Sequence, residues 1–255
     1  MSSDVFKFAF ITDAQLGMNS PGGLEAFGGD KLRLDRAIAY ANDPEHEIEF
    51  VVLGGDQVNN FCSEEQAEKE FSALELSLST LTVPYYGVAG NHDVERPGDE
   101  PQYIQRGLPV HFSMAHGNSY FVGINSVWLR GRFGEAQQEG EWDYMESQFA
   151  AAPADCKHVF VVMHWPLFIA HPDEPETYWN MPNRARIIEV FRKYNVSCAL
   201  SGHFHQDIDA RWHGISLITS IGICAPLQYA EERSFKVVTV FPDGWSTQRV
   251  SVDSL

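Results

Sequence analysis

Short apolar runs and helical patterns alternate along the first 200 residues of the chain. Each run has the length of one buried strand. In the segments between them, apolar residues recur every three or four positions, as they do on one face of a helix. This alternation predicts a layered α/β protein with parallel neighbouring strands. The predicted strands are residues 5–11, 48–53, 83–88, 119–125, 159–163 and 196–200, and the predicted helices are residues 31–41, 63–81, 135–149 and 182–194.

Capping residues and the remaining stretches complete this prediction. Asp30 is expected to cap the first helix, and Ser63 with Gln66 fits a capping box at the start of the second. Residues 95–117 contain three prolines and no clear period, which predicts irregular structure. The end of the chain predicts strands without helices between them, which indicates antiparallel strands in a second sheet. These strands are residues 215–220, 235–241 and 245–250.

The size of the chain allows a sizeable core without disulfides. At 255 residues it could form one domain or two, and no stretch reads as a linker, so we expect a single domain over residues 1–255. The N-terminus lacks the pattern of a signal peptide and no apolar run reaches membrane-spanning length, so a cytoplasmic location is the default expectation. The four cysteines are far apart and are expected to be reduced core thiols.

The charge of the chain is strongly negative. It has 18 basic and 35 acidic residues and a formal net charge of −17. This balance argues against a nucleic-acid surface and against binding to anionic membranes. It leaves an anionic substrate open, because bound divalent cations can dominate the field inside a pocket. The acidic residues of 63–81 are most simply a solvated outer face of that helix.

Side chains that bind metals follow five of the predicted strands. Parallel strands would bring all five groups to one edge of a sheet, where ligands of open α/β sheets gather. Carboxylate and amide oxygens suit hard cations, and imidazole suits zinc, iron, manganese or nickel, so the set fits a site for two metal ions. The groups are Asp13 with Gln15, Asp56, Asn91 with His92, His164, and His203 with His205.

Two details of spacing refine this site. Asp56 follows Gly54 and Gly55, which let the backbone turn tightly, so it is the natural carboxylate to bridge two metals. His203 and His205 are two residues apart, and in an extended segment both side chains would point the same way, each toward a different metal.

In this order the motifs D-x-[HQ], G-G-D, G-N-H-D, a His at a strand end and G-H-x-H resemble those of the calcineurin-like metallophosphoesterases. The resemblance extends from Asp13 to His205. It implies a four-layer α/β/β/α sandwich of two mixed sheets flanked by helices, and a dinuclear site. Manganese or iron is the first expectation for the metals, and zinc is the alternative.

The resemblance also implies a role for each matching residue. Asp13, Gln15, Asp56 and His205 match the ligands of one metal. The ligands of the other metal match Asp56, Asn91, His164 and His203. His92 matches the residue that assists the leaving oxygen, so His92, Asp56 and Asn91 form the expected catalytic group. A metal-bound hydroxide would be the nucleophile.

Two departures narrow the resemblance. Gln15 stands where most of the superfamily has His. An amide oxygen in place of an imidazole nitrogen favours harder metals. A Gln at this position resembles two branches of the family. One is the calcineurin-like phosphoesterase domain-containing protein 1 group of Ser/Thr phosphatases, and the other is the ADP-ribose/CDP-alcohol diphosphatases. Segment 173–206 resembles the first branch more. Asn59 and Asn60 replace the Asp and phosphate-binding Arg of the calcineurin-type protein phosphatases, which argues against a close similarity to those enzymes and against a protein substrate.

These observations predict a metal-dependent phosphoric ester hydrolase. Hydrolysis of phosphate monoesters, on a small molecule or a phosphoprotein, is the leading expectation. A phosphodiesterase or nucleotide diphosphatase on the same site is the alternative, and a non-catalytic scaffold is the third. The oligomeric state stays open, as does the role of Trp165, Tyr178, Trp179 and Asn180, which either wall the pocket or pack a surface loop.

Overall fold

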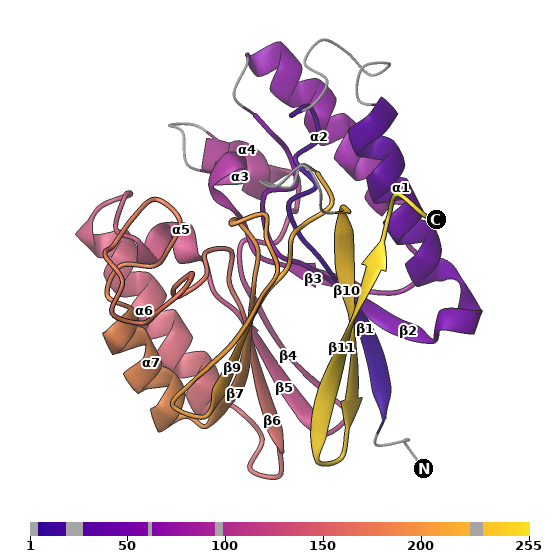
Figure 1. Cartoon of the computed structure of the whole chain (residues 1–255). Coiled ribbons are helices and arrows are strands. Elements are labelled where there is room, and N and C mark those ends of the chain that lie inside the picture. Colours follow the sequence, from indigo (N-terminus) through magenta and orange to yellow (C-terminus); the bar gives the residue numbers. More distant parts are fainter. Residues whose placement is uncertain (1–4, 19–27, 61–62, 95–98, 225–231) are drawn as a thin grey trace.

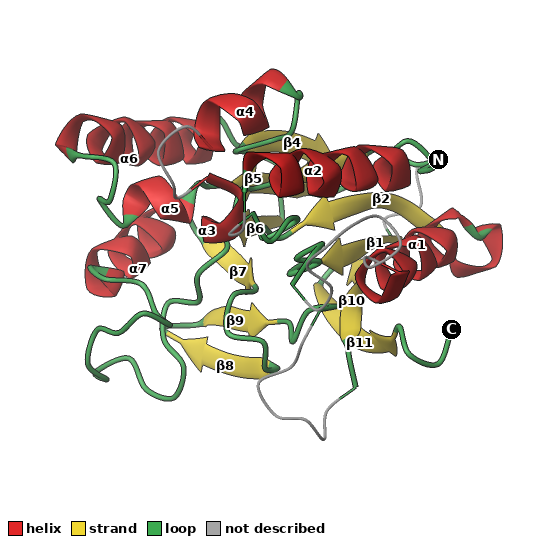
Figure 2. Ribbon diagram, turned by 90° about the horizontal axis from the view of Figure 1, so that it is seen from above, coloured by secondary structure: helices red, strands yellow, loops and turns green. Residues whose placement is uncertain are grey.

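The computed structural model describes residues 5–18, 28–60, 63–94, 99–224 and 232–255. Two β-sheets lie face to face between two layers of helices, as Figures 1 and 2 show. The expected four-layer α/β/β/α sandwich is therefore confirmed. Among the described residues, no helix is both long enough and apolar enough to cross a membrane.

The first sheet has the strand order β11-β10-β1-β2-β3. Strands β1, β2 and β3 are parallel, and β10 and β11 extend the sheet in antiparallel fashion beyond β1. The strands are β1 (Phe6–Ile11), β2 (Ile48–Leu53), β3 (Tyr85–Gly87), β10 (Ser234–Phe241) and β11 (Gly244–Ser251). Helices α1 (Gly28–Asn42) and α2 (Glu64–Leu78) cover the outer face of this sheet (Figure 1).

The second sheet has the order β4-β5-β6-β7-β9-β8. Its four central strands are parallel, and an antiparallel strand closes each edge. The strands are β4 (Phe112–His116), β5 (Ser119–Gly123), β6 (His158–Val162), β7 (Val196–Ser201), β8 (Ile208–Trp212) and β9 (Ile215–Thr219). Helices α6 (Glu135–Ala150) and α7 (Arg184–Lys193) cover its outer face (Figure 1).

The period of two along β1 explains how the layers join. Phe6, Phe8 and Phe10 point between the sheets, where they meet aromatic rings of the facing sheet such as Phe121. Ala9 and Ile11 point outward into the core beneath the helices. After the partly buried Lys7, both faces of the strand are therefore buried, which is why residues 8–11 are all apolar.

Several local predictions were wrong because tertiary contacts outweigh local sequence preference. Residues 95–117, expected to be irregular, include α4 (Asp99–Gln105) and the edge strand β4, which exists through its pairing with β5. Strand β9, at 215–219, does not join the antiparallel strands β10 and β11, but pairs in parallel with β7 in the other sheet. Short helices α3 (Asn91–Val94) and α5 (Ser126–Leu129) and the 3₁₀ turn Pro44–His46 complete the described elements.

The two predicted caps differ in outcome. Ser63 accepts a hydrogen bond from the Gln66 N–H at 3.1 Å, as expected for an N-cap. Asp30 is not a cap, because α1 begins at Gly28, and its buried carboxylate instead pairs with Arg33 and accepts from the Gly17 N–H.

Candidate metal site

The predicted site residues all lie shortly after the carboxyl ends of parallel strands, with Asn91 and His92 at the start of α3. The first sheet supplies Asp13 and Gln15 after β1, Asp56 after β2, and Asn91 and His92 after β3. The second supplies His164 after β6, and His203 and His205 after β7. The two sets meet between the sheets, because the Asp13 carboxylate accepts the His203 N–H at 3.1 Å and the Gly54 carbonyl contacts His164.

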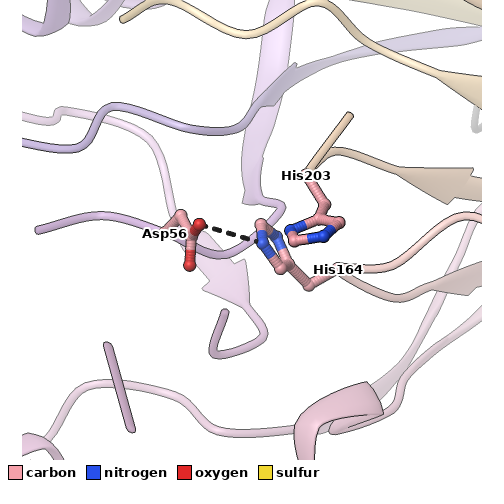
Figure 3. Close-up of side chains that lie close together, drawn as sticks. All are labelled: Asp56, His164 and His203. Atoms are coloured by element: carbon pink, nitrogen blue, oxygen red, sulfur yellow. Dashed lines mark ion pairs between the residues drawn. The ribbon is translucent and has the colours of Figure 1, made fainter. Parts of the chain in front are cut away.

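Three of these side chains form a compact buried group, shown in Figure 3. Asp56, His164 and His203 can each direct one ligating atom so that all three atoms lie within 4.8 Å of one another. The Asp56 carboxylate is 3.1 Å from His164 Nε2, and the rings of His164 and His203 are 5.1 Å apart. Such a closely spaced set of an acid and two imidazoles has the composition and the size of a transition-metal site.

Asp13, Gln15 and His205 form a second, adjacent group. His205 Nε2 lies 3.2 Å from the Asp13 carboxylate. The thiol of Cys224 donates to Gln15 Oε1 at 2.8 Å and lies 3.7 Å from His205 Nδ1. The thiol therefore connects Gln15 to His205 Nδ1, the ring nitrogen of His205 that does not face Asp13. Gln15 Oε1 keeps a second lone pair.

Backbone carbonyls fix which nitrogen of three imidazoles carries the hydrogen. A carbonyl can only accept, so the ring nitrogen beside it must be the N–H. In the neutral ring, which is the form that binds a metal, the other nitrogen keeps a lone pair. The lone pair falls on Nε2 of His164, Nδ1 of His203 and Nε2 of His92. The carbonyls are those of Gly54 for His164 (2.9 Å), Tyr178 for His203 (3.1 Å) and Asn59 for His92 (2.9 Å).

Asn91 carries the observation that best tests whether these residues suit a metal. Its amide nitrogen donates to the Tyr178 hydroxyl at 3.1 Å. Its oxygen is buried and has no hydrogen-bond partner among the described residues. A buried acceptor without a partner is costly, whereas an oxygen that binds a cation is satisfied.

The ionisable groups of the site shift one another's pKa. Burial alone would raise the pKa of Asp56, but the nearby His164 and His92 hold it well below its usual range. Burial lowers the pKa of His164, and the Asp56 carboxylate raises it to about 9. In the metal-free protein, the proton on His164 supplies the positive charge beside Asp56 that a metal would otherwise supply.

The backbone at the site is strained. Asp13, Gln15, Asp56, His203 and His205 all have positive φ, between 37° and 67°, a region that costs energy for residues other than glycine. The prediction that His203 and His205 lie in an extended segment was therefore wrong. They nevertheless face different neighbours, His203 toward His164 and His205 toward Asp13.

A glycine in each of two motifs allows close approach. A Cβ on Gly55 would lie 2.6 Å from His164 Nδ1, and its φ of +92° is unfavourable for other residues. A Cβ on Gly202 would collide with the side chains of Thr12 and Asp13. These glycines bring the loops of the two sheets together.

Two buried acids support the site and were not assigned a role from sequence. Asp93 accepts the N–H groups of Gln57, Val58 and Gly90 at 2.8–3.2 Å, which ties the Asp56 loop to the Asn91 loop. Glu70 of α2 is buried and accepts the Asn60 N–H at 2.6 Å, so the acidic residues of this helix are not all solvated. The sequence contained a signal for each acid. Asp93 is the last residue of the G-N-H-D motif, and Glu70 lies at helical spacing from the apolar residues Ala67 and Leu74.

Comparison with known proteins agrees with this geometry. The family model described as calcineurin-like phosphoesterase matches residues 6–207. The chain is 23% identical to Serine/threonine-protein phosphatase CPPED1 of Rattus norvegicus, over 98% of this chain and 85% of the relative. It is also 23% identical to the 3',5'-cyclic adenosine monophosphate phosphodiesterase CpdA of Escherichia coli K12, over 98% of this chain and 84% of that protein.

Solved structures share the fold. A dimetal phosphatase from Danio rerio superposes with a TM-score of 0.72 at 15% identity, covering 97% of this chain and 96% of that one. GAP50, the anchor in the inner membrane complex of Plasmodium, superposes with a TM-score of 0.67 at 15% identity, covering 97% and 85%. The family implies two divalent metal ions, and among the described residues Asp56, His164 and His203 form a group that could hold one. The chain therefore belongs to the calcineurin-like phosphoesterase family and is a metal-dependent phosphoric ester hydrolase.

Proposed function

We propose that the chain hydrolyses phosphate monoesters with two bound divalent metal ions, as a single domain over residues 1–255. The buried Asn91 oxygen that lacks a partner, beside the group of Asp56, His164 and His203, is the observation that carries this proposal. One metal would be held by Asp13, Gln15, Asp56 and His205, and the other by Asp56, Asn91, His164 and His203.

The metals would supply charge to neutralise the phosphoryl group and would make water acidic enough to attack it near neutral pH. The chain's part is to hold the ligands in place. Asp56 suits the shared position, because its loop is bonded to the β1 loop through Asp13 N–H to Gly55 O and Gln15 N–H to Asp56 O, at 3.0 and 2.9 Å. Its carboxylate is oriented by the His92 N–H, which donates to Oδ1 at 2.8 Å.

His92 is proposed to assist the leaving oxygen. Its Nδ1 donates to the Asn59 carbonyl, so Nε2 is the atom that can accept and donate a proton. That atom lies 3.9 Å from the Asp56 carboxylate, and the side chain is partly exposed. It can therefore reach both the metal group and an entering substrate.

The ligand set favours manganese or iron over zinc. Two of the proposed ligands, Gln15 and Asn91, are neutral amides whose oxygens suit harder cations, while the imidazoles suit transition metals. The substrate is proposed to be a phosphorylated small molecule in the cytoplasm. A phosphoprotein is the lesser alternative, because Asn59 and Asn60 stand where calcineurin-type protein phosphatases have Asp and Arg. Similarity to the CPPED1 phosphatases supports a monoester, and similarity to CpdA keeps a phosphodiesterase as the alternative.

The test is a manganese-supplemented activity screen over monoesters, cyclic nucleotides and dinucleotide diphosphates. We expect hydrolysis of monoesters, abolished by chelation and by His164→Ala, whose imidazole is a proposed ligand. A matched control is His213→Ala, since His213 follows β8 and lies outside both ligand groups. Faster hydrolysis of cyclic nucleotides would replace the monoesterase by the phosphodiesterase, and full activity after complete metal removal would refute both.

A further inference from the structure

The loop between β6 and α7 is held in one shape by its own side chains. The Glu174 carboxylate accepts three successive N–H groups, those of residues 169–171, at 2.7–3.2 Å, and also the Asn180 side chain. The Arg184 guanidinium donates to the loop carbonyls of Pro172, Glu174 and Met181. These bonds hold the loop in a fixed shape, and the loop in turn supports one residue next to the metal site.

That residue is Tyr178, and its carbonyl fixes it against the metal site. The carbonyl accepts from Trp165 Nε1 at 2.8 Å and from His203 Nε2 at 3.1 Å. Trp165 is fully buried, and Arg130 lies over its ring at 4.7 Å and also donates to the Asn180 carbonyl. The position of the Tyr178 backbone is thus set by contacts that do not involve its side chain.

The phenol of Tyr178 reaches the other ligand group by a different bond. Its oxygen is 3.1 Å from the amide nitrogen of Asn91, and an amide nitrogen has no lone pair, so the phenol accepts this bond. The phenol hydrogen is then left over, and no acceptor for it is found in the described part of the chain. Tyr178 is 41% exposed, so a molecule entering the site can reach this hydrogen.

A phosphoryl group is the ligand that such a donor fits. Asn91 orients its oxygen inward and its nitrogen toward Tyr178, so the phenol sits one side chain away from the proposed metal position. A phosphoryl group bound there has non-bridging oxygens with lone pairs and negative charge, and a hydroxyl donor to an ionised acceptor makes a strong hydrogen bond.

We propose that Tyr178 is a substrate-binding residue whose phenol O–H donates to a non-bridging oxygen of the phosphoryl group bound beside Asn91. This inference rests on the proposed function. It concerns the side chain alone, because the backbone of Tyr178 keeps its bond to His203 whatever side chain it carries.

The test compares wild type, Tyr178→Phe and Tyr194→Phe, all loaded with manganese. Tyr194 is the matched control, since its hydroxyl contacts Glu146 at 3.3 Å at the end of α7. Inorganic phosphate is the probe, titrated by calorimetry, and elemental analysis gives the metal content. We expect Tyr178→Phe to bind phosphate about tenfold more weakly, the scale of one hydrogen bond to a charged group. Its metal content should be unchanged, and Tyr194→Phe should match wild type.

Turnover gives a second readout. Because the phenol is proposed to contact a non-bridging oxygen, kcat/KM of Tyr178→Phe should fall by the same factor for nitrophenyl phosphate and for an alkyl phosphate. Unchanged phosphate affinity would overturn the proposal, as would a metal-loaded wild type that binds no phosphate. Loss of a metal from Tyr178→Phe would also overturn it, because the phenol would then act only through Asn91. A wild type that binds phosphate but hydrolyses no ester would refute the proposed function and leave this comparison intact.

Discussion

Asp93 offers a test of how the segments that carry Asp56 and Asn91 are held together. Its two oxygens accept three backbone N–H groups, with Gln57 and Val58 on one oxygen and Gly90 on the other. Gln57 follows Asp56 directly and Gly90 precedes Asn91, so this one carboxylate connects the loops of two proposed ligands. Burial and the neighbouring Asp56 raise the pKa of Asp93 to about 7. Because the carboxyl group is then only partly charged near neutral pH, the main effect of Asp93→Asn is to replace one accepting oxygen by an NH₂ group.

The size of the effect follows from the three bonds. An Asn at position 93 can keep its oxygen toward Gln57 and Val58, but its amide nitrogen then faces the Gly90 N–H, donor against donor. One buried hydrogen bond is lost and one N–H is left unsatisfied, which costs about 1–3 kcal/mol. For a chain of this length, this lowers the melting temperature by roughly 2–4 °C per kcal/mol. Displacement of Asn91 should weaken metal binding by about 10- to 100-fold.

The assay is thermal melting of the metal-free protein together with calorimetric titration of manganese. The control is Asp43→Asn, the same chemical change at a cap where Asp accepts the Glu45 N–H at 2.9 Å and where Asn caps equally well. Asp43→Asn should match wild type in both measurements. If Asp93→Asn also melts and binds manganese like wild type, Asp93 does not hold the two loops, and the reasoning from its three bonds is wrong.

Three further predictions follow from the site. His92→Asn should retain its metals but lose about 10²–10⁴-fold in turnover, the usual scale of acid–base catalysis. The loss should be smaller for nitrophenyl phosphate, and equal losses on good and poor leaving groups would mean that His92 only positions the phosphate. Gln15→His should tighten one metal site in a calorimetric titration and leave the other nearly unchanged, because imidazole binds borderline metals more strongly than an amide does; identical isotherms would exclude Gln15 as a ligand. In the metal-free protein, burial lowers the pKa of His164, but Asp56 raises it to about 9, above the ordinary value of 6.5. The stability from this pair is complete below pH 6.5 and is lost as the pH rises through about 9. Melting of chelated protein should show this loss and melting of His164→Gln should not, and identical pH profiles would contradict it.

The sequence by itself determined the kind of site and the order of its parts. Strands within the sheets are largely buried and are therefore mainly apolar, as in residues 5–11 and 48–53. Such a run can be recognised from the sequence of that segment alone. Each ligand motif follows its strand directly, so the carboxyl edge of the parallel strands could be predicted as the place where they gather. The types and spacing of these residues then sufficed to indicate two-metal phosphoesterase chemistry, which the family match bears out.

Only the tertiary structure decided how these residues face one another. The edge strands β4 and β8 are each only five residues long, with half-buried and exposed side chains alternating, and they form through pairing with β5 and β9. The turn at His203 and His205 is set by contact with Asp13, which lies 190 residues away along the chain. Likewise, the Tyr178 carbonyl that fixes the hydrogen of His203 is brought there by a loop whose shape depends on Glu174 and Arg184. Orientation of a ligand depends on partners distant in sequence, and no local pattern encodes them.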